Sequence, residues 1–273
     1  MADAANPAPA FDTSVPNAAR MYDYWLGGKD NFAADREAAS RSAHAVPQLP
    51  WLARENRKFL GRAVRFCAKA GVRQFLDIGA GLPTMDSVHH VAERHIAEPH
   101  VVYVDHDPLV VAHARALLAT PYTAAVQGDL TRPDELLGTA EVRELIDFSE
   151  PVAILLVAIL HFVPDEADPA GCVAKLREAM APGSCLVISH VEMVPGQMRG
   201  MQPQSGAARE LGEARRGMPP GQARTRDELA AFFDGMTMVE PGLTDVWNWR
   251  PDAGQVALPS DVMAVVGGVA RKD

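Results

Sequence analysis

The chain has 273 residues, of which 48% are hydrophobic, and a formal net charge of −9 at pH 7. This length and composition predict one large α/β domain, or such a domain with appendages, with enough apolar residues for a core. The negative charge argues against a nucleic-acid partner, because phosphate binding needs a basic face.

Cysteine usage and apolar runs indicate where the protein works. Cys67, Cys172 and Cys185 are widely spaced and odd in number, so we expect buried free thiols and no disulfide framework or metal site. No apolar run approaches the roughly 18 residues of a membrane span. The first ten residues lack the basic and apolar regions of a signal peptide. We therefore expect a cytoplasmic protein, no membrane partner and a disordered tail at residues 1–14.

Residues 15–70 are predicted to form an N-terminal helical extension. Apolar residues at helical spacing predict helices over residues 18–26, 31–44 and 51–70. Gly27 and Gly28 end the first helix, and Gly71 follows the third helix as a glycine past a helix end usually does.

From residue 71 onward, strand and helix patterns alternate, which is typical of βαβ units and a parallel sheet. The predicted strands cover residues 74–78, 101–105, 124–127, 151–160, 184–190, 236–240 and 263–269. The predicted helices cover residues 85–97, 109–119, 135–146, 169–180 and 229–233. The strands are nearly continuous apolar runs, so we expect helices on both faces of the sheet. Residues 192–221, rich in Gly, Pro, Gln and Met, are predicted to form a lid-like insertion within this domain of residues 71–273.

A short acidic and glycine-rich run follows the first predicted strand. Asp77 ends the strand, and Gly79, Ala80 and Gly81 follow. Glycine lets the backbone approach a ligand, and a helix start beyond it presents free N–H groups. Dinucleotide folds usually have a third glycine, where this chain has Thr84. An acid before the first glycine can instead bind an ammonium group, which S-adenosylmethionine carries and NAD lacks. We therefore predict that this loop binds S-adenosylmethionine; an ordinary glycine-rich turn and an NAD-dependent dehydrogenase are the alternatives.

The second strand also ends in an acid. Asp105 lies roughly 20 residues beyond the glycine loop, where an acid binds the ribose hydroxyls of an adenosine cofactor. His106 beside it is included in the predicted cofactor site. Asp107 is the alternative for the ribose, but because Pro108 follows it we expect Asp107 to cap a helix.

The third strand ends at Gly128 and Asp129. The Asp129 carboxylate is predicted to accept a hydrogen bond from the adenine amino group, and the Leu130 backbone N–H to donate to a ring nitrogen. An acid at a strand end is usually only a helix cap, but here three successive strands end this way on one sheet edge. Ligands of open α/β sheets bind at that edge.

The fourth strand leads to the candidate catalytic residue. His161 follows it at the ligand edge and is predicted to act as a base, and Ala158 is included among the cofactor contacts. The alternative is a structural histidine bonded to the backbone. No H-E-x-x-H or C-x-x-C spacing occurs, so no metal site is predicted.

These motifs, in this order, resemble class I S-adenosylmethionine-dependent methyltransferases. The chain is most similar to a bacterial S-adenosyl methyltransferase-like family, on residues 16–32, 55–60, 241–243 and 249–251. The resemblance implies a Rossmann-like, seven-stranded, mostly parallel sheet with helices on both faces and an antiparallel last strand. Pro83 stands where many members have a third glycine, which affects the shape of the loop more than the cofactor, since proline is tolerated in a first helical turn.

The first predicted helix carries Arg20, Tyr22, Tyr24 and Trp25. We expect Arg20 to pair with the methionine carboxylate of the cofactor through its planar fork. The aromatic rings, Tyr24 among them, would exclude water from the sulfonium. The alternative is a helix that merely covers the flank of the sheet.

Together these features predict an S-adenosylmethionine-dependent methyltransferase that acts on a small-molecule acceptor. Methyl transfer depends mainly on positioning, so such an enzyme needs no strong base. The alternative is a non-catalytic S-adenosylmethionine-binding sensor or interaction protein, because no acceptor-side catalytic group is evident.

Overall fold

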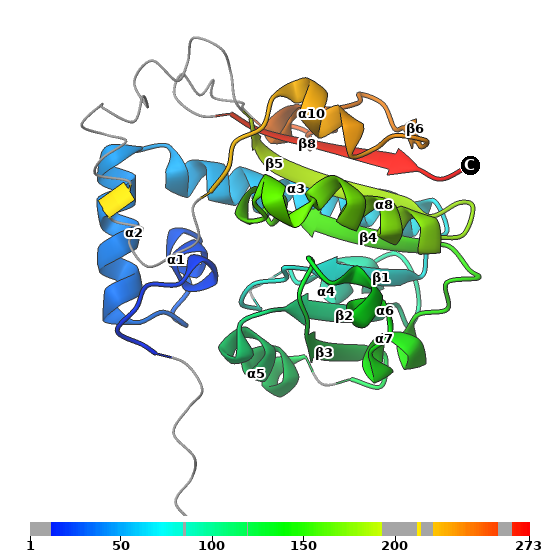
Figure 1. The fold of residues 1–273 in the computed structure, drawn as a ribbon, viewed down its shortest axis with the longest axis horizontal. Helices are drawn as coiled ribbons and strands as arrows, with labels where there is room; N and C mark the ends of the chain where they lie inside the picture. The colour runs from blue at the N-terminus through cyan, green and yellow to red at the C-terminus, as the bar shows by residue number, and fades with distance from the viewer. Residues whose placement is uncertain (1–11, 84–85, 119, 193–211, 214–220, 256–263) are drawn as a thin grey trace, which may run out of the picture.

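The computed structural model describes residues 12–83, 86–118, 120–192, 212–213, 221–255 and 264–273 (Figure 1). The helices α1 (Ala18–Trp25), α2 (Ala33–Ala45) and α3 (Leu49–Lys69) precede the sheet, as predicted. The Asn17 side chain caps α1 by accepting from two backbone amides. Gly71 has a φ of +94° directly after α3, a conformation in which glycine is not strained.

The described residues form an eight-stranded sheet with the order β3-β2-β1-β4-β5-β8-β6, in which β7 also pairs with β8. The strands are β1 (Gln74–Ile78), β2 (His100–Asp105), β3 (Thr123–Gln127), β4 (Val152–Val157), β5 (Cys185–Glu192), β6 (Thr237–Met238), β7 (Thr244–Asp245) and β8 (Ala264–Arg271). The first five are parallel, and β8 runs antiparallel to β5. The predicted mostly parallel sheet with an antiparallel last strand is confirmed.

The eighth strand arises where a single sixth strand was predicted. Thr237 of β6 lies opposite Arg271, and Thr244 of β7 lies opposite Gly267, so both segments pair with β8 at different points along its length. The predicted strand over residues 236–240 is therefore only two residues long, and the chain returns to the sheet at β7.

Helices cover both faces of the sheet, as predicted. On one face, α3, α4 (Val88–Glu93) and α5 (Pro108–Leu117) pack against alternate strand residues such as Phe75. On the other face, α6 (Pro133–Leu137), α7 (Ala140–Leu145), α8 (Pro169–Ala179) and α10 (Arg226–Ala231) pack against residues such as Leu76. Each fully buried side chain of this kind contributes about 1.5–3 kcal/mol, so these two layers hold the sheet rigid.

Several predicted elements have different lengths in the structure. The helix predicted over residues 135–146 is two helices, because α6 ends at Leu137, before Gly138, and α7 begins after Thr139. The helix predicted over residues 85–97 is reduced to α4. The strand predicted over residues 151–160 ends at Val157, since Ala158 has a φ of +58°, and short 3-10 helices η1 (Leu160–Phe162) and η2 (Asp165–Ala167) follow.

Two predicted segments lie mostly outside the described residues. They are the tail before residue 12 and the insertion at residues 193–211 and 214–220. In the part of the chain that is described, no helix is long and apolar enough to cross a membrane. The parallel strands point toward α1 and α2, which lie beyond their carboxyl ends (Figure 1). The N-terminal helices therefore face the edge at which ligands of such sheets bind.

Candidate active site

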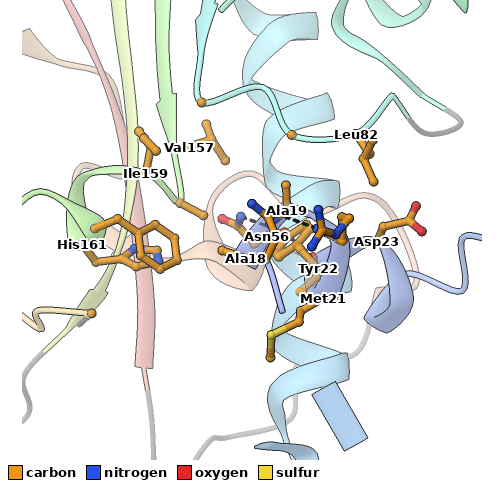
Figure 2. Close-up of a pocket in the computed structure, with 18 of the residues that line it drawn as sticks. Ala18, Ala19, Met21, Tyr22, Asp23, Asn56, Leu82, Val157, Ile159 and His161 are labelled. Atoms are coloured by element: carbon orange, nitrogen blue, oxygen red, sulfur yellow. Dashed lines mark hydrogen bonds between the residues drawn. The ribbon is translucent and has the colours of Figure 1, made fainter. Parts of the chain in front are cut away.

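A cavity of about 930 Å³ lies between the carboxyl edge of the sheet and the N-terminal helices. Its walls come from α1, α3 and the segments after β1, β2, β4 and β5. Figure 2 shows Val157, Ile159 and His161 on one side of it, and Ala18, Met21 and Asp23 of α1 on the other. The volume is at the upper end of the range of about 300–1,000 Å³ for small-molecule and cofactor sites. The cavity thus has room for a cofactor and a second small molecule.

The glycine loop after β1 is fixed by backbone hydrogen bonds to Val104 and by close packing against Ile159. Gly79 and Gly81 have φ values of +76° and +65°. The backbone amides of Gly79 and Ala80 both donate to the carbonyl oxygen of Val104, at 2.8 and 3.1 Å. A Cβ atom on Gly79 would lie 2.6 Å from Cγ1 of Ile159, so only glycine fits there. Gly79, Ala80 and Gly81 all line the cavity, as does Asp77 before them.

Asp77 is a buried carboxylic acid at the end of β1. Burial raises the pKa of Asp77 to about 7, and the negative charge of Asp105 adds to the rise, while the positive charge of Arg57 opposes it. A buried acid of this kind ionises readily only when a cation lies beside it. Arg57 extends from α3 and lines the same cavity. The end of β1 therefore suits a ligand that carries an ammonium group.

Asp105 and Asp107 have separate roles in the structure. Oδ2 of Asp105 accepts from the Gly81 amide and Oδ1 from the Asp107 amide, both at 3.0 Å, and this carboxylate lines the cavity. Asp107 caps α5, as predicted, with Oδ1 accepting from the Leu109 amide at 2.8 Å. Its Oδ2 accepts from Asn17 Nδ2 at 2.7 Å, which attaches the start of α1 to this loop. Asp105 and Asp107 both line the cavity and both accept two hydrogen bonds, so Asp105 remains the candidate for ribose on its position at the end of β2, with His106 beside it on the cavity wall.

The residues predicted after β3 lie away from the cavity. Gly128, Asp129 and Leu130 are not among its lining residues. Asp129 is exposed, and its Oδ1 accepts from the Thr131 amide at 2.8 Å, which is a turn contact. This arrangement does not favour the predicted contact of Asp129 and Leu130 with adenine, which stays a prediction.

The α1 residues divide between the cavity and the surface. Arg20 lines the cavity, but its Nε donates to Asp35 at 2.8 Å and its Nη2 to the Val15 carbonyl at 2.6 Å. Tyr24 is outside the cavity lining, 37% exposed, and its hydroxyl accepts from Ser40. Tyr22 points inward instead and lines the cavity. Arg20 thus holds α1 against α2, and Tyr22, rather than Tyr24, is the tyrosine that faces a ligand.

His161 and Ala158 both line the cavity after β4. The half-buried His161 ring packs beside Phe162 and His190, with ring centroids 4.3 and 5.5 Å away. Burial, together with the Arg224 charge and against the hydrogen bond to the Val191 carbonyl, lowers the pKa of His190 to about 4. His190 Nε2 lies 2.9 Å from Arg224 Nη1, so His190 is neutral and accepts from the guanidinium. His190 is thereby occupied, and His161 remains the candidate base.

Sequence reasoning assigned no role to two polar residues of α3. Asn56 is buried and lines the cavity together with Arg57. Asn56 lies four residues after Leu52 on the apolar face of α3. A polar side chain on an otherwise apolar helix face was the feature of the sequence that could have identified it as a site residue. What it contacts could not be read from one helix, because its partner Ser189 is 133 residues away.

The strand order, the antiparallel β8, the glycine loop after β1 and the acid that ends β2 together define a Rossmann-like methyltransferase fold. The sequence pattern of the S-adenosyl methyltransferase family matches residues 4–273. The chain therefore belongs to the S-adenosyl methyltransferase family.

Solved structures agree with this family. The chain is 40% identical to a proposed methyltransferase from Thermobifida fusca YX, with a TM-score of 0.86 over 98% of each chain. It is 41% identical to a DUF574 family protein from Streptomyces avermitilis MA-4680, with a TM-score of 0.86 over 96% of this chain and 99% of that one. The plantazolicin methyltransferase BamL, solved with a triazolic desmethylPZN analogue and S-adenosylhomocysteine, is 10% identical over 93% of this chain and 95% of its own; its TM-score of 0.54 shows the shared fold alone. No match was found among curated proteins.

The chain is therefore an S-adenosylmethionine-dependent methyltransferase. The family confirms the predicted cofactor and supports an enzyme over the non-catalytic alternative.

Proposed function

We propose that the protein methylates a small molecule inside the cavity, with the cofactor along the sheet edge and the acceptor beside it. The observation that carries this proposal is one cavity of about 930 Å³ that reaches from Asp105 on β2 to His161 after β4. The cofactor and the acceptor are thus enclosed within the same cavity. The net charge of −9 favours a small molecule over a nucleic acid as acceptor. The three free, buried cysteines support a reducing compartment such as the cytoplasm.

The residues at the sheet edge fit the cofactor. Asp105 presents a carboxylate for the ribose hydroxyls, and each such charge-assisted bond contributes about 1.5–3 kcal/mol. Asp77 supplies a buried acid for the amino group, and ionises when that cation lies beside it. We assign the methionine carboxylate to Arg57, because the Arg20 guanidinium already bonds to Asp35 and Val15. Arg57 can neutralise that carboxylate while it also faces Asp77.

The cavity also has apolar lining residues that suit an apolar acceptor. Its lining includes the side chains of Met21, Leu49, Leu52, Phe162 and Val265. When bound, the cofactor supplies a methyl group on a sulfonium, which an acceptor lone pair can displace. The walls bring the acceptor into line, and well-aligned reactions reach effective molarities of about 10⁵–10⁸ M. His161 receives the proton that the acceptor atom loses.

A release assay tests this function. The full chain is incubated with S-adenosylmethionine and a library of small apolar molecules that carry hydroxyl or amino groups, and S-adenosylhomocysteine is quantified. We expect release with at least one acceptor, and a rate about 10²–10⁴-fold lower in His161→Ala. His95→Ala, at an exposed histidine after α4, is the matched control and should keep the full rate. Cofactor binding without release on any acceptor would contradict the proposal.

A further inference from the structure

A chain of buried and partly buried hydrogen bonds connects the N-terminal helices to the end of β4. The Ala158 amide donates to Ser189 Oγ at 3.0 Å, and Ser189 Oγ donates to Asn56 Oδ1 at 2.6 Å. Asn56 Nδ2 donates to the Tyr22 hydroxyl at 3.0 Å, which donates to the Ala53 carbonyl at 2.9 Å. Tyr22, Asn56 and Ser189 each accept one bond and donate another in this chain, so their side chains orient one another.

The chain of bonds ends at a backbone position that would not hold its conformation alone. Ala158 has a φ of +58°, in the left-handed region that residues with a Cβ rarely adopt. Its amide donates both to Ser189 Oγ and to the Ser189 carbonyl oxygen, the latter at 3.1 Å. Such conformations persist when surrounding contacts enforce them, and they concentrate at functional sites.

The turn at Ala158 determines where the cofactor loop lies. Ile159, the next residue, packs so closely on Gly79 that a Cβ atom there would lie 2.6 Å from its side chain. Both Ile159 and Gly79 line the cavity. A change in the Ala158 conformation would move Ile159, and with it the support of the glycine loop. Asn56 is therefore connected to the loop through Ser189, Ala158 and Ile159, although it belongs to a helix that precedes the sheet.

We propose that Asn56 and Ser189 are positioning residues of the cofactor site: they hold Ala158 in its left-handed conformation and so keep the glycine loop in the shape that binds S-adenosylmethionine. The inference rests on the proposed cofactor site and deepens it. It makes the N-terminal helices part of the machinery that sets cofactor affinity.

A double-mutant cycle on the full chain tests the inference, with S-adenosylhomocysteine as the titrated ligand. Ser189→Ala removes the side-chain acceptor of the Ala158 amide and leaves only the Ser189 carbonyl oxygen, and we expect about tenfold weaker binding. Ala158→Gly removes the need to enforce the left-handed conformation. In the Ala158→Gly background, the additional loss caused by Ser189→Ala should shrink to less than about threefold, because the two changes act on one feature. Amide exchange at Ala158 should also speed up in Ser189→Ala.

The controls separate this inference from the proposed function. Ser149→Ala removes a serine hydroxyl that bonds to Asp147 near the opposite edge of the sheet, and should bind as the unaltered chain does. An equal loss in both backgrounds, or no loss in either, would overturn the inference. If the unaltered chain bound no S-adenosylhomocysteine, the proposed cofactor site would fail instead. Should Ser189→Ala not fold, Asn56→Ala is titrated in both backgrounds instead, since it removes the acceptor that orients the Ser189 hydroxyl beside the Ala158 amide.

Discussion

The two walls of the cavity are built on different principles. The sheet wall consists of residues at strand ends, such as Asp77 and Asp105, whose positions follow from strand order and pleat. The helical wall, formed by α1 and α3, is attached by buried polar bonds such as Arg20 to Asp35 and Asn56 to Ser189. The sheet wall thus supplies the chemistry that recognises the cofactor, and the helical wall depends on a few specific bonds to stay in place.

The largest expected effect is on the attachment of the helical wall. Asp35 accepts from the Arg20 guanidinium and from the amides of Asn17 and Phe32, and its side chain is fully buried. Asp35→Ala should lower the free energy of unfolding by about 3–5 kcal/mol, because it leaves Arg20 buried without its partner. Denaturant unfolding measures this.

Glu37→Ala is the matched control on the same helix. Glu37 pairs with Arg41 at the surface, and such pairs contribute about 0–1 kcal/mol. Equal losses for Asp35→Ala and Glu37→Ala would show that the buried bond does not hold the helical wall.

The next effect concerns Asp77 in the sheet wall, whose carboxylate should lower the stability of the folded protein and strengthen cofactor binding. Its pKa is about 7 in the folded protein, against 3.8 ordinarily. Between these values the folded protein keeps a proton that the unfolded chain has lost, so stability falls as pH rises through this window. At pH 8, Asp77→Asn should gain about 2–4 kcal/mol, or roughly 4–8 °C in melting temperature.

The same substitution should weaken S-adenosylhomocysteine binding at least about tenfold, since the amide cannot pair with the ammonium group. At pH 4 the gain in melting temperature should be much smaller, because the folded protein still keeps its proton and only a little over half of the unfolded chains have lost it. A gain of equal size at pH 4 and pH 8 would show that ionisation of Asp77 is not its cause.

A smaller effect is expected at Asp105. Asp105→Ala should weaken cofactor binding at least about tenfold, the equivalent of ~1.4 kcal/mol, and the protein should stay folded. Asp107→Ala is the comparison, since this residue caps α5 and should lose mainly stability, by about 1 kcal/mol. Unchanged affinity in folded Asp105→Ala, with a loss in Asp107→Ala, would transfer the ribose to Asp107. Calorimetric titration distinguishes the two.

The last effect, of about the same size as that at Asp105, is expected in the glycine loop. Gly81 has a φ of +65°, and a Cβ atom there would meet nothing within 4 Å. Gly81→Ala should therefore lower the free energy of unfolding by only about 1–2 kcal/mol, which is the cost of a left-handed backbone conformation in a residue with a Cβ atom. Thermal unfolding measures this cost. A much larger loss would mean that the loop is packed more tightly than the structure shows.

The same contrast explains which features of the two walls could be predicted from the sequence. The end of β1 and the cap role of Asp107 were predicted because strand patterns and caps are local. The role given to Arg20 depended on one helix, whereas its partner Asp35 lies on another, fifteen residues away. Asp129 was chosen by analogy with the other strand ends, but the chain after β3 turns it to the surface. Contacts such as Asn56 to Ser189 arise only when distant segments pack.

A crystal structure of the protein with S-adenosylhomocysteine tests the central claim most directly. The account predicts the ligand in the cavity between the two walls, with its ribose on Asp105, its amino group beside Asp77 and its carboxylate beside Arg57. A ligand bound outside this cavity, or one that bypasses Asp77 and Asp105 within it, would contradict the account.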